Sequence, residues 1–340
     1  MEFLYFLEGL RNPVFDFIFS LITHLGEETF FLVAAIFVFW CVDKRGGYYI
    51  LTTGLIGTVL NQWLKFIFRI DRPWVLDPEF EPIGDALEEA SGYSFPSGHT
   101  QNIAGTFGSI FAYFKKNWLR ISCIAIIILV AFSRNYLGVH TPLDVVVSLG
   151  IALVLVVALY PVFSNEERFK KAMPFIIGGC FLLSLGFLIY VNRLNPADFT
   201  GEGELDNLTS GLKNGSTLFG CMLGLLVVYP VDTLITKFDT KANWYSQIIK
   251  LALGLGIILV IKALQSPIEA VVGIFTPAPT YIARAISYFL IVVFAGAVWP
   301  LTFKFFGDLK IGFMEKFTEW ITSKFKKTQH APASTDTREV

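Results

Sequence analysis

Three short polar segments interrupt an otherwise apolar chain: KFIFRIDRP at 65–73, PSGH at 96–99 and SRNYLGVHTPLD at 133–144. Each segment lies at the end of an apolar run of membrane-spanning length. A helix needs about 20 mainly apolar residues to cross a bilayer. The apolar runs therefore predict a bundle of membrane helices, and the polar segments predict a site at the ends of those helices.

The composition agrees with a membrane protein. Of the 340 residues, 54% are apolar and only 16% are charged, whereas soluble domains usually contain about 25% charged residues. The formal net charge is −1, so bulk charge predicts no nucleic-acid partner. The four cysteines lie in apolar segments without the spacing of metal ligands or disulfides, and we interpret them as small core residues.

The fold predicted from the hydropathy pattern is all-α, a polytopic membrane bundle of about nine transmembrane helices. An interfacial helix or helix pair is predicted before them, because charged residues interrupt the apolar pattern of 3–24. An amphipathic helix is predicted after them, in the C-terminal tail. The predicted spans are 27–43, 48–68, 100–115, 118–138, 142–163, 172–191, 215–235, 246–265 and 281–303.

The distribution of lysine and arginine predicts the orientation of the bundle, because cytoplasmic loops are enriched in these residues. Basic residues follow the first, third, fifth and seventh predicted helices and continue in the tail after the ninth. Connections on the other side are acidic or neutral apart from the motif cations, Arg193 and Lys213. We therefore expect the three motifs outside the cytoplasm and the C-terminus inside it.

These patterns divide the chain into five predicted regions. A core bundle with the three motifs, 27–163, follows an interfacial N-terminal segment, 1–26. An additional four-helix membrane region, 164–303, precedes a basic amphipathic cytoplasmic helix, 304–327, with Phe313, Phe317 and Trp320 at helical spacing. Residues 328–340 are predicted to be disordered.

The loop 74–94 contains six acidic residues and no basic residue. It is either a solvated loop or a gate that selects which phosphates reach the cations beneath it.

The third polar segment predicts a paired histidine and carboxylate. Thr141, Pro142 and Asp144 form the pattern of a helix-start capping box, which explains Thr141 and Asp144 without catalysis. It does not explain His140 or Arg134 at the membrane edge. Asp144 can also accept a hydrogen bond from one nitrogen of His140, which leaves the other nitrogen unprotonated for attack.

The second segment, Pro96-Ser97-Gly98-His99, begins a predicted helix. Helix N-termini present unpaired backbone N–H groups and bind anions. An ordinary cap accounts for Ser97 and Gly98, but a cap needs no histidine. His99 therefore favours a binding site over a simple helix start.

The first segment supplies Lys65 and Arg72. Both residues could simply extend toward the membrane interface. If both point inward, Arg72 and Arg134 can hold phosphate oxygens in bidentate fashion, with Lys65 as a point charge.

Together the three segments resemble the signature of the type 2 phosphatidic acid phosphatase superfamily, which includes glucose-6-phosphatase, sphingosine-1-phosphate phosphatases and vanadium haloperoxidases. Eleven signature residues are present at the family's spacings, and the resemblance covers mainly 27–163. The nine-helix layout is similar to that of glucose-6-phosphatase and the sphingosine-1-phosphate phosphatases. The eleven residues are Lys65, Arg72, Pro73, Pro96, Ser97, Gly98, His99, Ser133, Arg134, His140 and Asp144.

The resemblance implies a role for each polar residue. His140 is the expected nucleophile, oriented by Asp144, and His99 is the expected acid for the leaving group. The expected phosphate ligands are Lys65, Arg72, Ser97, Gly98 and Arg134. No metal or other cofactor is expected, because these cations stabilise the charge that Mg²⁺ stabilises elsewhere.

The sequence thus predicts a metal-independent membrane phosphatase that forms a phosphohistidine and acts on a lipid phosphate, a monoester or a diphosphate, at the outer face. Two alternatives stay open: a phosphatase for a soluble phosphate such as a sugar phosphate, and a lipid or phosphate transporter. Lys262 and Arg284 near the last two predicted spans motivate the transporter. They could equally be outer-boundary anchors or phosphate contacts from the additional helices, and we interpret them as anchors. The expected partners are a membrane lipid substrate and the bilayer.

Overall fold

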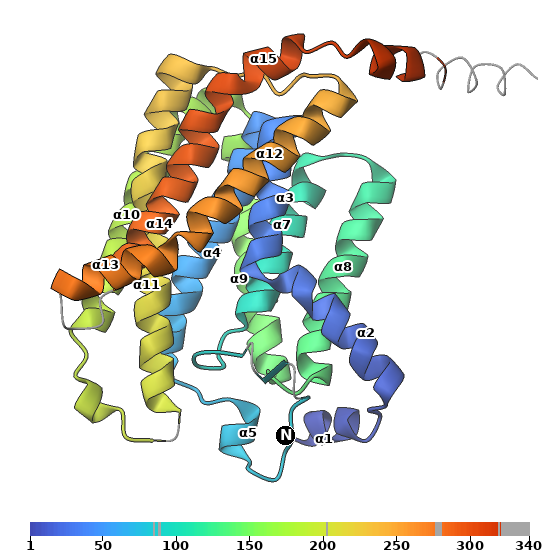
Figure 1. Ribbon diagram of the computed structural model, residues 1–340. Coiled ribbons are helices and arrows are strands. Elements are labelled where there is room, and N and C mark those ends of the chain that lie inside the picture. The colour runs from blue at the N-terminus through green and yellow to red at the C-terminus, as the bar shows by residue number, and fades with distance from the viewer. Residues whose placement is uncertain (84–85, 88–89, 202, 276–280, 319, 321–340) are drawn as a thin grey trace, which may run out of the picture.

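The computed structural model describes residues 1–83, 86–87, 90–201, 203–275, 281–318 and 320. Within these residues the chain is helical and contains no β-strand. The longer helices run roughly along one direction and form a bundle (Figure 1). The predicted all-α class is confirmed.

The N-terminal half contains the three motifs. Two short helices precede a bend, and a 3₁₀ turn at the bend (η1, His24–Gly26) leads into longer helices. A π-helical turn (η2, Val38–Val42) extends the first of these. The helices are α1 (Glu2–Glu8), α2 (Pro13–Thr23), α3 (Glu28–Phe37), α4 (Lys44–Phe68), α5 (Pro73–Leu76), α7 (Gly98–Tyr113), α8 (Asn117–Tyr136) and α9 (Pro142–Phe163).

The C-terminal half adds another group of helices, several of them continued by short π or 3₁₀ turns. These turns are η3 (Pro196–Asp198), η4 (Asp232–Thr236), η5 (Phe294–Val298) and η6 (Trp299–Thr302). The helices are α10 (Glu166–Asn192), α11 (Glu204–Val231), α12 (Trp244–Ala263), α13 (Gln265–Phe275), α14 (Ile282–Val293) and α15 (Phe303–Asp308).

Each predicted span is helical over most of its length in the described part of the chain, but the predicted number of spans is not confirmed. Among the described residues, six helical segments are long and apolar enough to cross a membrane. A seventh span exists if α2 and α3, which are bent by 55° where η1 joins them, cross the membrane together. The chain is therefore a multi-pass membrane protein, and its described part contains six or seven candidate spans by length and composition.

The helices α4 and α7 fall short of that criterion for two different reasons. Helix α7 has only 16 residues. Helix α4 has 25 residues but carries polar side chains such as Asn61, Gln62 and Lys65, all of them buried. It packs against α3, α7, α9, α10 and α11. A helix surrounded by other helices needs no apolar face toward lipid, so α4 tolerates polar residues that a peripheral span would not.

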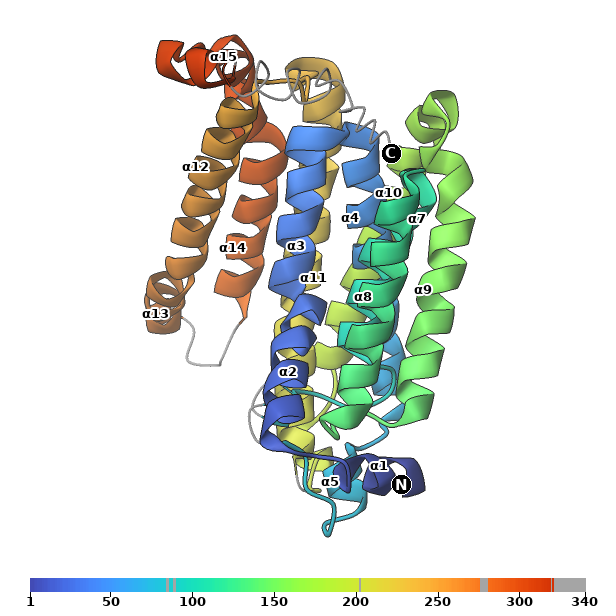
Figure 2. The same cartoon turned by 90° about the vertical axis from the view of Figure 1, so that its right-hand side faces the viewer.

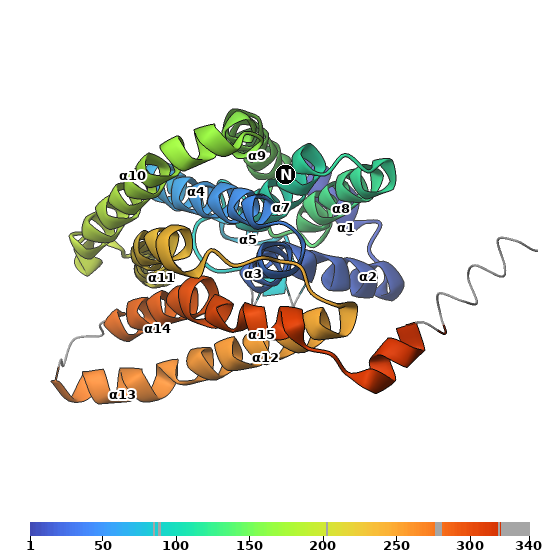
Figure 3. The ribbon, with the colours of Figure 1, turned by 90° about the horizontal axis from the view of Figure 1, so that it is seen from above.

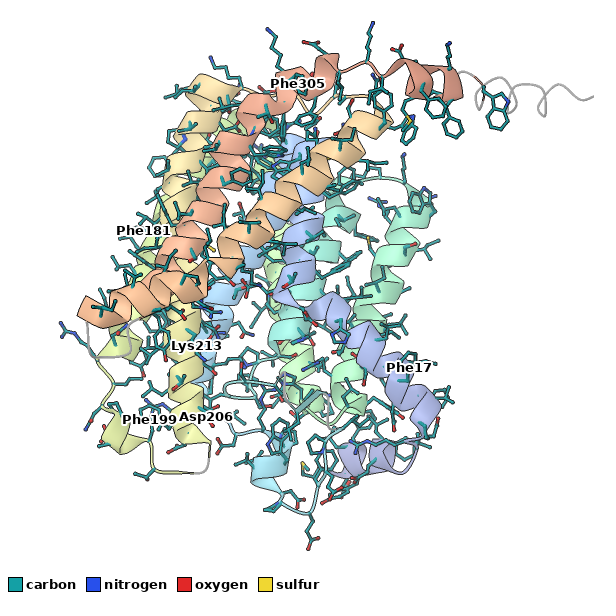
Figure 4. All side chains as sticks on the ribbon, in the orientation of Figure 1. Phe17, Phe181, Phe199, Asp206, Lys213 and Phe305 are labelled. Carbon is teal, nitrogen blue, oxygen red and sulfur yellow. The ribbon has the colours of Figure 1, made fainter. Side chains whose placement is uncertain are left out.

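The helices around this centre expose large apolar side chains. Phe17 on α2 and Phe305 on α15 point outward (Figure 4) and are 71% and 64% exposed. Isolated exposed apolar residues are common, but whole faces of α8, α9 and α12 are exposed and apolar. Such faces are typical of helices that contact lipid.

The two ends of the bundle differ in charge. The basic connections after α7, α9 and α11 lie at the same end as α15, whereas α1, α5 and the motif-bearing connections lie at the opposite end (Figures 1 and 2). We call the latter the motif end. This alternation is the one that the lysine and arginine pattern predicts.

The two ends of the chain are described in part. At the N-terminus, α1 and α2 form a helix pair where one was predicted, within 3–24. At the C-terminus, α15 ends at Asp308 and a second helical segment covers 312–318, where Phe313 is 75% exposed. Residues 319 and 321–327 of the predicted amphipathic helix, and the predicted disordered tail, lie outside the described residues.

Candidate active site

Six of the eight predicted site residues line one cavity of about 180 Å³ at the motif end of the bundle. They come from all three polar segments, so the fold brings together residues that the sequence separates by up to 75 positions. Ser97 and Asp144 lie behind the cavity wall and contact the residues that form it. The six lining residues are Lys65, Arg72, Gly98, His99, Arg134 and His140.

Three neighbouring side chains hold His140 in one tautomer. Its Nε2 lies 3.0 Å from Nη1 of Arg72. A guanidinium has only donors, so Nε2 must provide a lone pair to this contact. The proton of the neutral imidazole is therefore on Nδ1, which lies 3.4 Å from Oδ2 of Asp144 and 3.3 Å from Oγ of Ser94. The unprotonated nitrogen of His140 is therefore Nε2, which faces Arg72.

Asp144 both caps a helix and supports His140. Its Oδ2 accepts from the backbone N–H of Thr141 at 2.7 Å, and its own N–H donates to Oγ1 of Thr141 at 3.4 Å. This is the predicted capping box at the start of α9. The same Oδ2 accepts a 2.7 Å hydrogen bond from Ser94. The carboxylate is 1% exposed, so these contacts fix its position beside the imidazole.

A tight turn connects the arginine and histidine of the third motif. The carbonyl of Arg134 accepts from the backbone N–H groups of Val139 and His140 at 3.2 and 3.3 Å. Gly138 has a φ of +77°, and a Cβ at this position would lie 2.7 Å from Nη2 of Arg11. The turn therefore needs glycine, and it sets the distance between Arg134 and His140.

The end of the acidic loop forms one wall of the site. Arg72 donates to the carbonyls of Ser91 and Gly92 at 2.8 and 2.9 Å, and Lys65 donates to the carbonyl of Tyr93. Both cations point into the protein, so interfacial snorkelling does not describe either. Farther along the loop, Asp77 accepts from the hydroxyl of Tyr5 at 2.9 Å. The loop is thus tied to the site at one end and to α1 at the other.

Arg134 and His99 lie on the side of the cavity that faces the bend between α2 and α3. Arg134 donates to Oγ1 of Thr23 at the end of α2. A Cβ added to Gly26 would lie 3.0 Å from Cβ of His99, so the bend packs directly against this histidine. Nε2 of His99 is buried and has no hydrogen-bond partner among the described residues. His99 therefore keeps a polar atom without a partner next to the cavity that it lines.

The start of α7 has the geometry of a capped helix. Oγ of Ser97 accepts from the backbone N–H of Thr100 at 3.4 Å, and the residue is fully buried. The Ser97 hydroxyl therefore caps the start of α7 and is not part of the cavity wall, which supports the interpretation of Ser97 as a helix cap. The carbonyl of Ser97 accepts from Ser148 at 2.9 Å. This bond joins the start of α7 to α9.

The charges around His140 set its protonation. Burial lowers the pKa of His140 well below its usual range, and the cations Arg72, Arg134 and Lys65 act in the same direction. Burial also lowers the pKa of Arg72 to about 10, so Arg72 remains protonated at neutral pH. A neutral imidazole surrounded by cations is suited to attack an anionic phosphorus centre.

The sequence analysis missed several residues of the site. Ser94 has no sequence signal that distinguishes it from other loop serines. Asn214 and Thr217 of α11, together with Glu28 of α3, also line the cavity. The helix α11 belongs to the region predicted to be separate from the core, and its position beside the cavity depends on long-range packing.

Arg284 also differs from its interpretation as a boundary anchor. Its Nε donates to Oγ1 of Thr217 at 2.8 Å, and its guanidinium carbon lies 5.6 Å from the centre of the Tyr288 ring. The side chain therefore points into the bundle. In the part of the chain that the structure describes, no group of three or more histidine, cysteine, aspartate or glutamate residues could hold a metal ion.

Comparison with protein families identifies both halves of the membrane region. Residues 46–168 match the model of the PAP2 superfamily, and residues 216–310 match the model described as "PAP2 superfamily phosphatase, transmembrane extension". The first match contains all three motifs, and the second contains the helices α12 to α15 with most of α11. No solved structure shows a significant match to the chain.

Curated relatives are similar over parts of the chain. Phosphatidylglycerophosphatase B of Bacillus subtilis (strain 168) is 29% identical over 180 residues, 48% of this chain and 80% of the relative. A probable sphingosine-1-phosphate phosphatase of Dictyostelium discoideum is 30% identical over 235 residues, 65% of this chain and 55% of the relative. Undecaprenyl-diphosphatase BcrC of Bacillus subtilis (strain 168) is 29% identical over 148 residues, 43% of this chain and 73% of the relative. The chain thus spans about half the length of its sphingosine-1-phosphate phosphatase relative.

Proposed function

Because the chain belongs to the PAP2 superfamily and is a membrane phosphatase, we propose that it hydrolyses a lipid phosphate, a monoester or a diphosphate, through a phosphohistidine on His140. The relatives named above act on phosphatidylglycerophosphate, sphingosine 1-phosphate and undecaprenyl diphosphate. All three substrates combine a phosphate with an apolar chain, which supports a lipid substrate for this chain.

One observation carries the proposal: Nε2 of His140 has its lone pair on the side of Arg72, 3.0 Å away, while Nδ1 faces Asp144 and Ser94. This is the arrangement of an activated nucleophile supported by a carboxylate. A phosphate bound in the cavity would take the place of the direct contact between Arg72 and His140. It would then lie between the nucleophile and its charge partner.

The reaction follows in two steps. Nε2 of His140 attacks phosphorus, a P–N bond forms, and the P–O bond to the lipid breaks while His99 gives its proton to the leaving oxygen. Water then attacks the phosphohistidine, His99 takes a proton from that water, and the P–N bond breaks to release phosphate. Lys65, Arg72 and Arg134 stabilise the negative charge of the phosphoryl oxygens in both steps.

This account needs no metal, because three cationic side chains line or border the place where the phosphoryl charge develops. We expect phosphate release by the purified protein to be unchanged after treatment with a chelator such as EDTA. Strict dependence on an added divalent ion would contradict the role given to the cations.

We place the active site at the extracytoplasmic face and the C-terminus in the cytoplasm. The support is the positive-inside rule, since basic residues gather at the bundle end opposite the motifs. A lipid could then present its phosphate to the cavity from the outer leaflet.

The central experiment follows the intermediate. The purified protein is mixed with lipid phosphate labelled at phosphorus and quenched within a turnover. The wild type should retain label in a form that is stable to alkali and lost in acid, as N–P bonds are. His140→Ala should neither retain label nor release phosphate, while folding to the same thermal midpoint within a few degrees. Turnover or labelled protein in His140→Ala would refute the nucleophile assignment.

The alternative functions are separated by two further measurements. Turnover of long-chain lipid phosphates should exceed that of glucose 6-phosphate, and the reverse ranking would indicate a soluble substrate. In reconstituted vesicles we expect phosphate release without lipid flux. Flux that survives His140→Ala would indicate a transporter.

A further inference from the structure

A second, larger cavity adjoins the catalytic one. It has a volume of about 480 Å³ and lies between α3, α11, α12 and α14. This volume is within the ~300–1,000 Å³ range of small-molecule binding sites. Glu28 and Leu32 of α3 line both cavities, so the two spaces meet at the start of that helix.

The larger cavity is polar at one end and apolar along the rest of its length. Its charged side chains are Glu28, Lys262 and Arg284, and the other lining residues are mainly aliphatic or aromatic. Glu28 begins α3, Lys262 is in the last turn of α12 and Arg284 is in the first turn of α14. All three positions lie on the same side of the bundle, toward the catalytic cavity.

One face of α11 connects the two cavities. Asn214, Thr217 and Cys221 line the catalytic cavity, and Leu225 and Val228 line the apolar one. The spacings of three and four residues keep these side chains on one continuous helix face. Arg284 reaches across the boundary, because its hydrogen-bond partner Thr217 belongs to the catalytic cavity.

The depth of the apolar cavity matches one leaflet of a bilayer. Along α3 and the turn η2 that extends it, the lining runs from Glu28 to Phe39, which is about 16 Å at ~1.5 Å per helical residue. The hydrocarbon core of a bilayer is ~30 Å thick, so one leaflet accounts for ~15 Å. A lipid chain that extends inward from a phosphate in the catalytic cavity could therefore lie along the full depth of the apolar cavity.

The two sides of this cavity come from different parts of the fold. The helix α3 packs against α4 and α7 of the motif-bearing core, whereas α12 packs against α14. Seen from above, α3 lies between these two groups of helices (Figure 3). Residues outside the motif-bearing core thus build one wall of a space that adjoins the active site.

We propose that this cavity, which we call the chain cavity, holds the hydrocarbon chain of the lipid phosphate whose phosphoryl group lies beside His140. The inference rests on the proposed phosphatase function and extends it: the helices α11, α12 and α14 recognise the substrate chain. Glu28 and Arg284, at the junction, face the polar atoms that connect the chain to the phosphate.

The first test fills the chain cavity with a larger side chain. Ile258→Trp on α12 and Val33→Trp on α3 each place an indole in the cavity. Val260→Trp is the matched control, because Val260 is on the same helix, is 59% exposed and does not line the cavity. Two substrates are compared, a lipid phosphate with a sixteen-carbon chain and an analogue with a four-carbon chain.

We expect both cavity variants to lower kcat/KM for the long-chain substrate at least tenfold and for the short-chain substrate less than twofold. Val260→Trp should change neither value. An equal loss of kcat/KM for both substrates, or no loss for either, would contradict the proposal that this cavity holds the substrate chain. Failure of the phosphatase function itself would instead appear as wild-type phosphate release that is no greater than that of His140→Ala with either substrate.

The second test does not depend on turnover. A lipid phosphate with a photoreactive diazirine at the end of its chain is irradiated with the wild-type protein and with Ile258→Trp. Labelled peptides should come from α11, α12 and α14 in the wild type and decrease at least tenfold in the variant. Label confined to the outer faces of α8, α9 or α10 would place the chain in the bilayer and refute the proposal.

Discussion

Asp144 illustrates how one side chain serves both folding and the site. Its carboxylate completes the capping box of α9 and lies 3.4 Å from Nδ1 of His140. Capping and support of the imidazole are therefore not alternative explanations at this position. The same oxygen accepts from Ser94, which is completely buried, so the carboxylate is held by the loop as well as by the helix start.

Ser94→Ala should test this support. Without the serine hydroxyl, Asp144 loses a 2.7 Å hydrogen bond and the imidazole loses part of its orientation. Groups that orient a ligand or catalytic residue in this way typically contribute about 10–100-fold. We expect kcat to fall by roughly that factor, with little change in KM, in steady-state assays.

The control for that prediction is Ser184→Ala on α10. Ser184 is also completely buried and donates to the carbonyl of Phe181 at 2.9 Å, but it does not line the site. Its kcat should stay within twofold of the wild type. Equal losses in the two variants would mean that Ser94 acts only on stability.

The protonation of His140 gives a prediction that can be measured directly. Its lowered pKa means that the neutral imidazole persists below the usual histidine pKa of about 6.5. In a protein labelled with ¹³C-histidine, the His140 resonance, assigned by its loss in His140→Ala, should titrate with a midpoint below that usual value.

Arg72→Met should move that midpoint upward, because a cation beside the imidazole is removed. A wild-type midpoint at or above pH 6.5 would contradict the electrostatic account of the site.

At the scale of elements, the connection between α8 and α9 determines the spacing of the third motif. The five residues between Arg134 and His140, which are the last two of α8 and the first three of the connection, form a turn that folds back on the Arg134 carbonyl. The positive φ of Gly138 allows this turn. The motif spacing in the sequence thus reflects a local backbone geometry as much as a set of catalytic groups.

Gly138→Ala should damage both stability and activity. A non-glycine residue in the left-handed region costs about 1–2 kcal/mol, and the added Cβ would lie 2.7 Å from Arg11 and 2.8 Å from Phe80. We expect a lower thermal midpoint and at least a tenfold loss of kcat/KM, because His140 moves relative to Arg134.

Gly178→Ala on α10 is the matched control. A Cβ at this position meets nothing within 4 Å, and alanine in a helix interior is favoured over glycine by about 0.5–1 kcal/mol. Its activity should be unchanged and its midpoint equal or higher. Wild-type activity in Gly138→Ala would show that the turn does not position the site.

At the scale of the whole molecule, the bundle separates basic and motif-bearing ends, and this separation predicts the topology in the membrane. Cysteines introduced at Glu79 and Lys171, in a Cys41→Ala background, report on the two ends. The other native cysteines are buried.

In intact cells, a membrane-impermeant maleimide should label Glu79→Cys at the motif end and should label Lys171→Cys only after the membrane is opened. The opposite pattern would place the site at the cytoplasmic face. The side chains at both positions are exposed in the structure. A lack of label therefore means that the membrane blocks the reagent, not that the position is buried within the protein.

The sequence by itself determined the helical segments, the membrane class and the identity of the motif residues. These features depend on runs of apolar residues and on helix-start signals, which are local in the chain. His140, Asp144 and the capping box were predictable for this reason, as was the alternation of basic and motif-bearing connections.

Only the tertiary structure decided which residues meet. It placed Ser94 against Asp144, α11 beside the catalytic cavity and Arg284 inside the bundle. It also showed why α4 carries polar residues without facing lipid. These features depend on contacts between segments far apart in the chain. The sequence does not predict them, because hydrophobic periodicity indicates which face of a helix is buried but not which helix packs against that face.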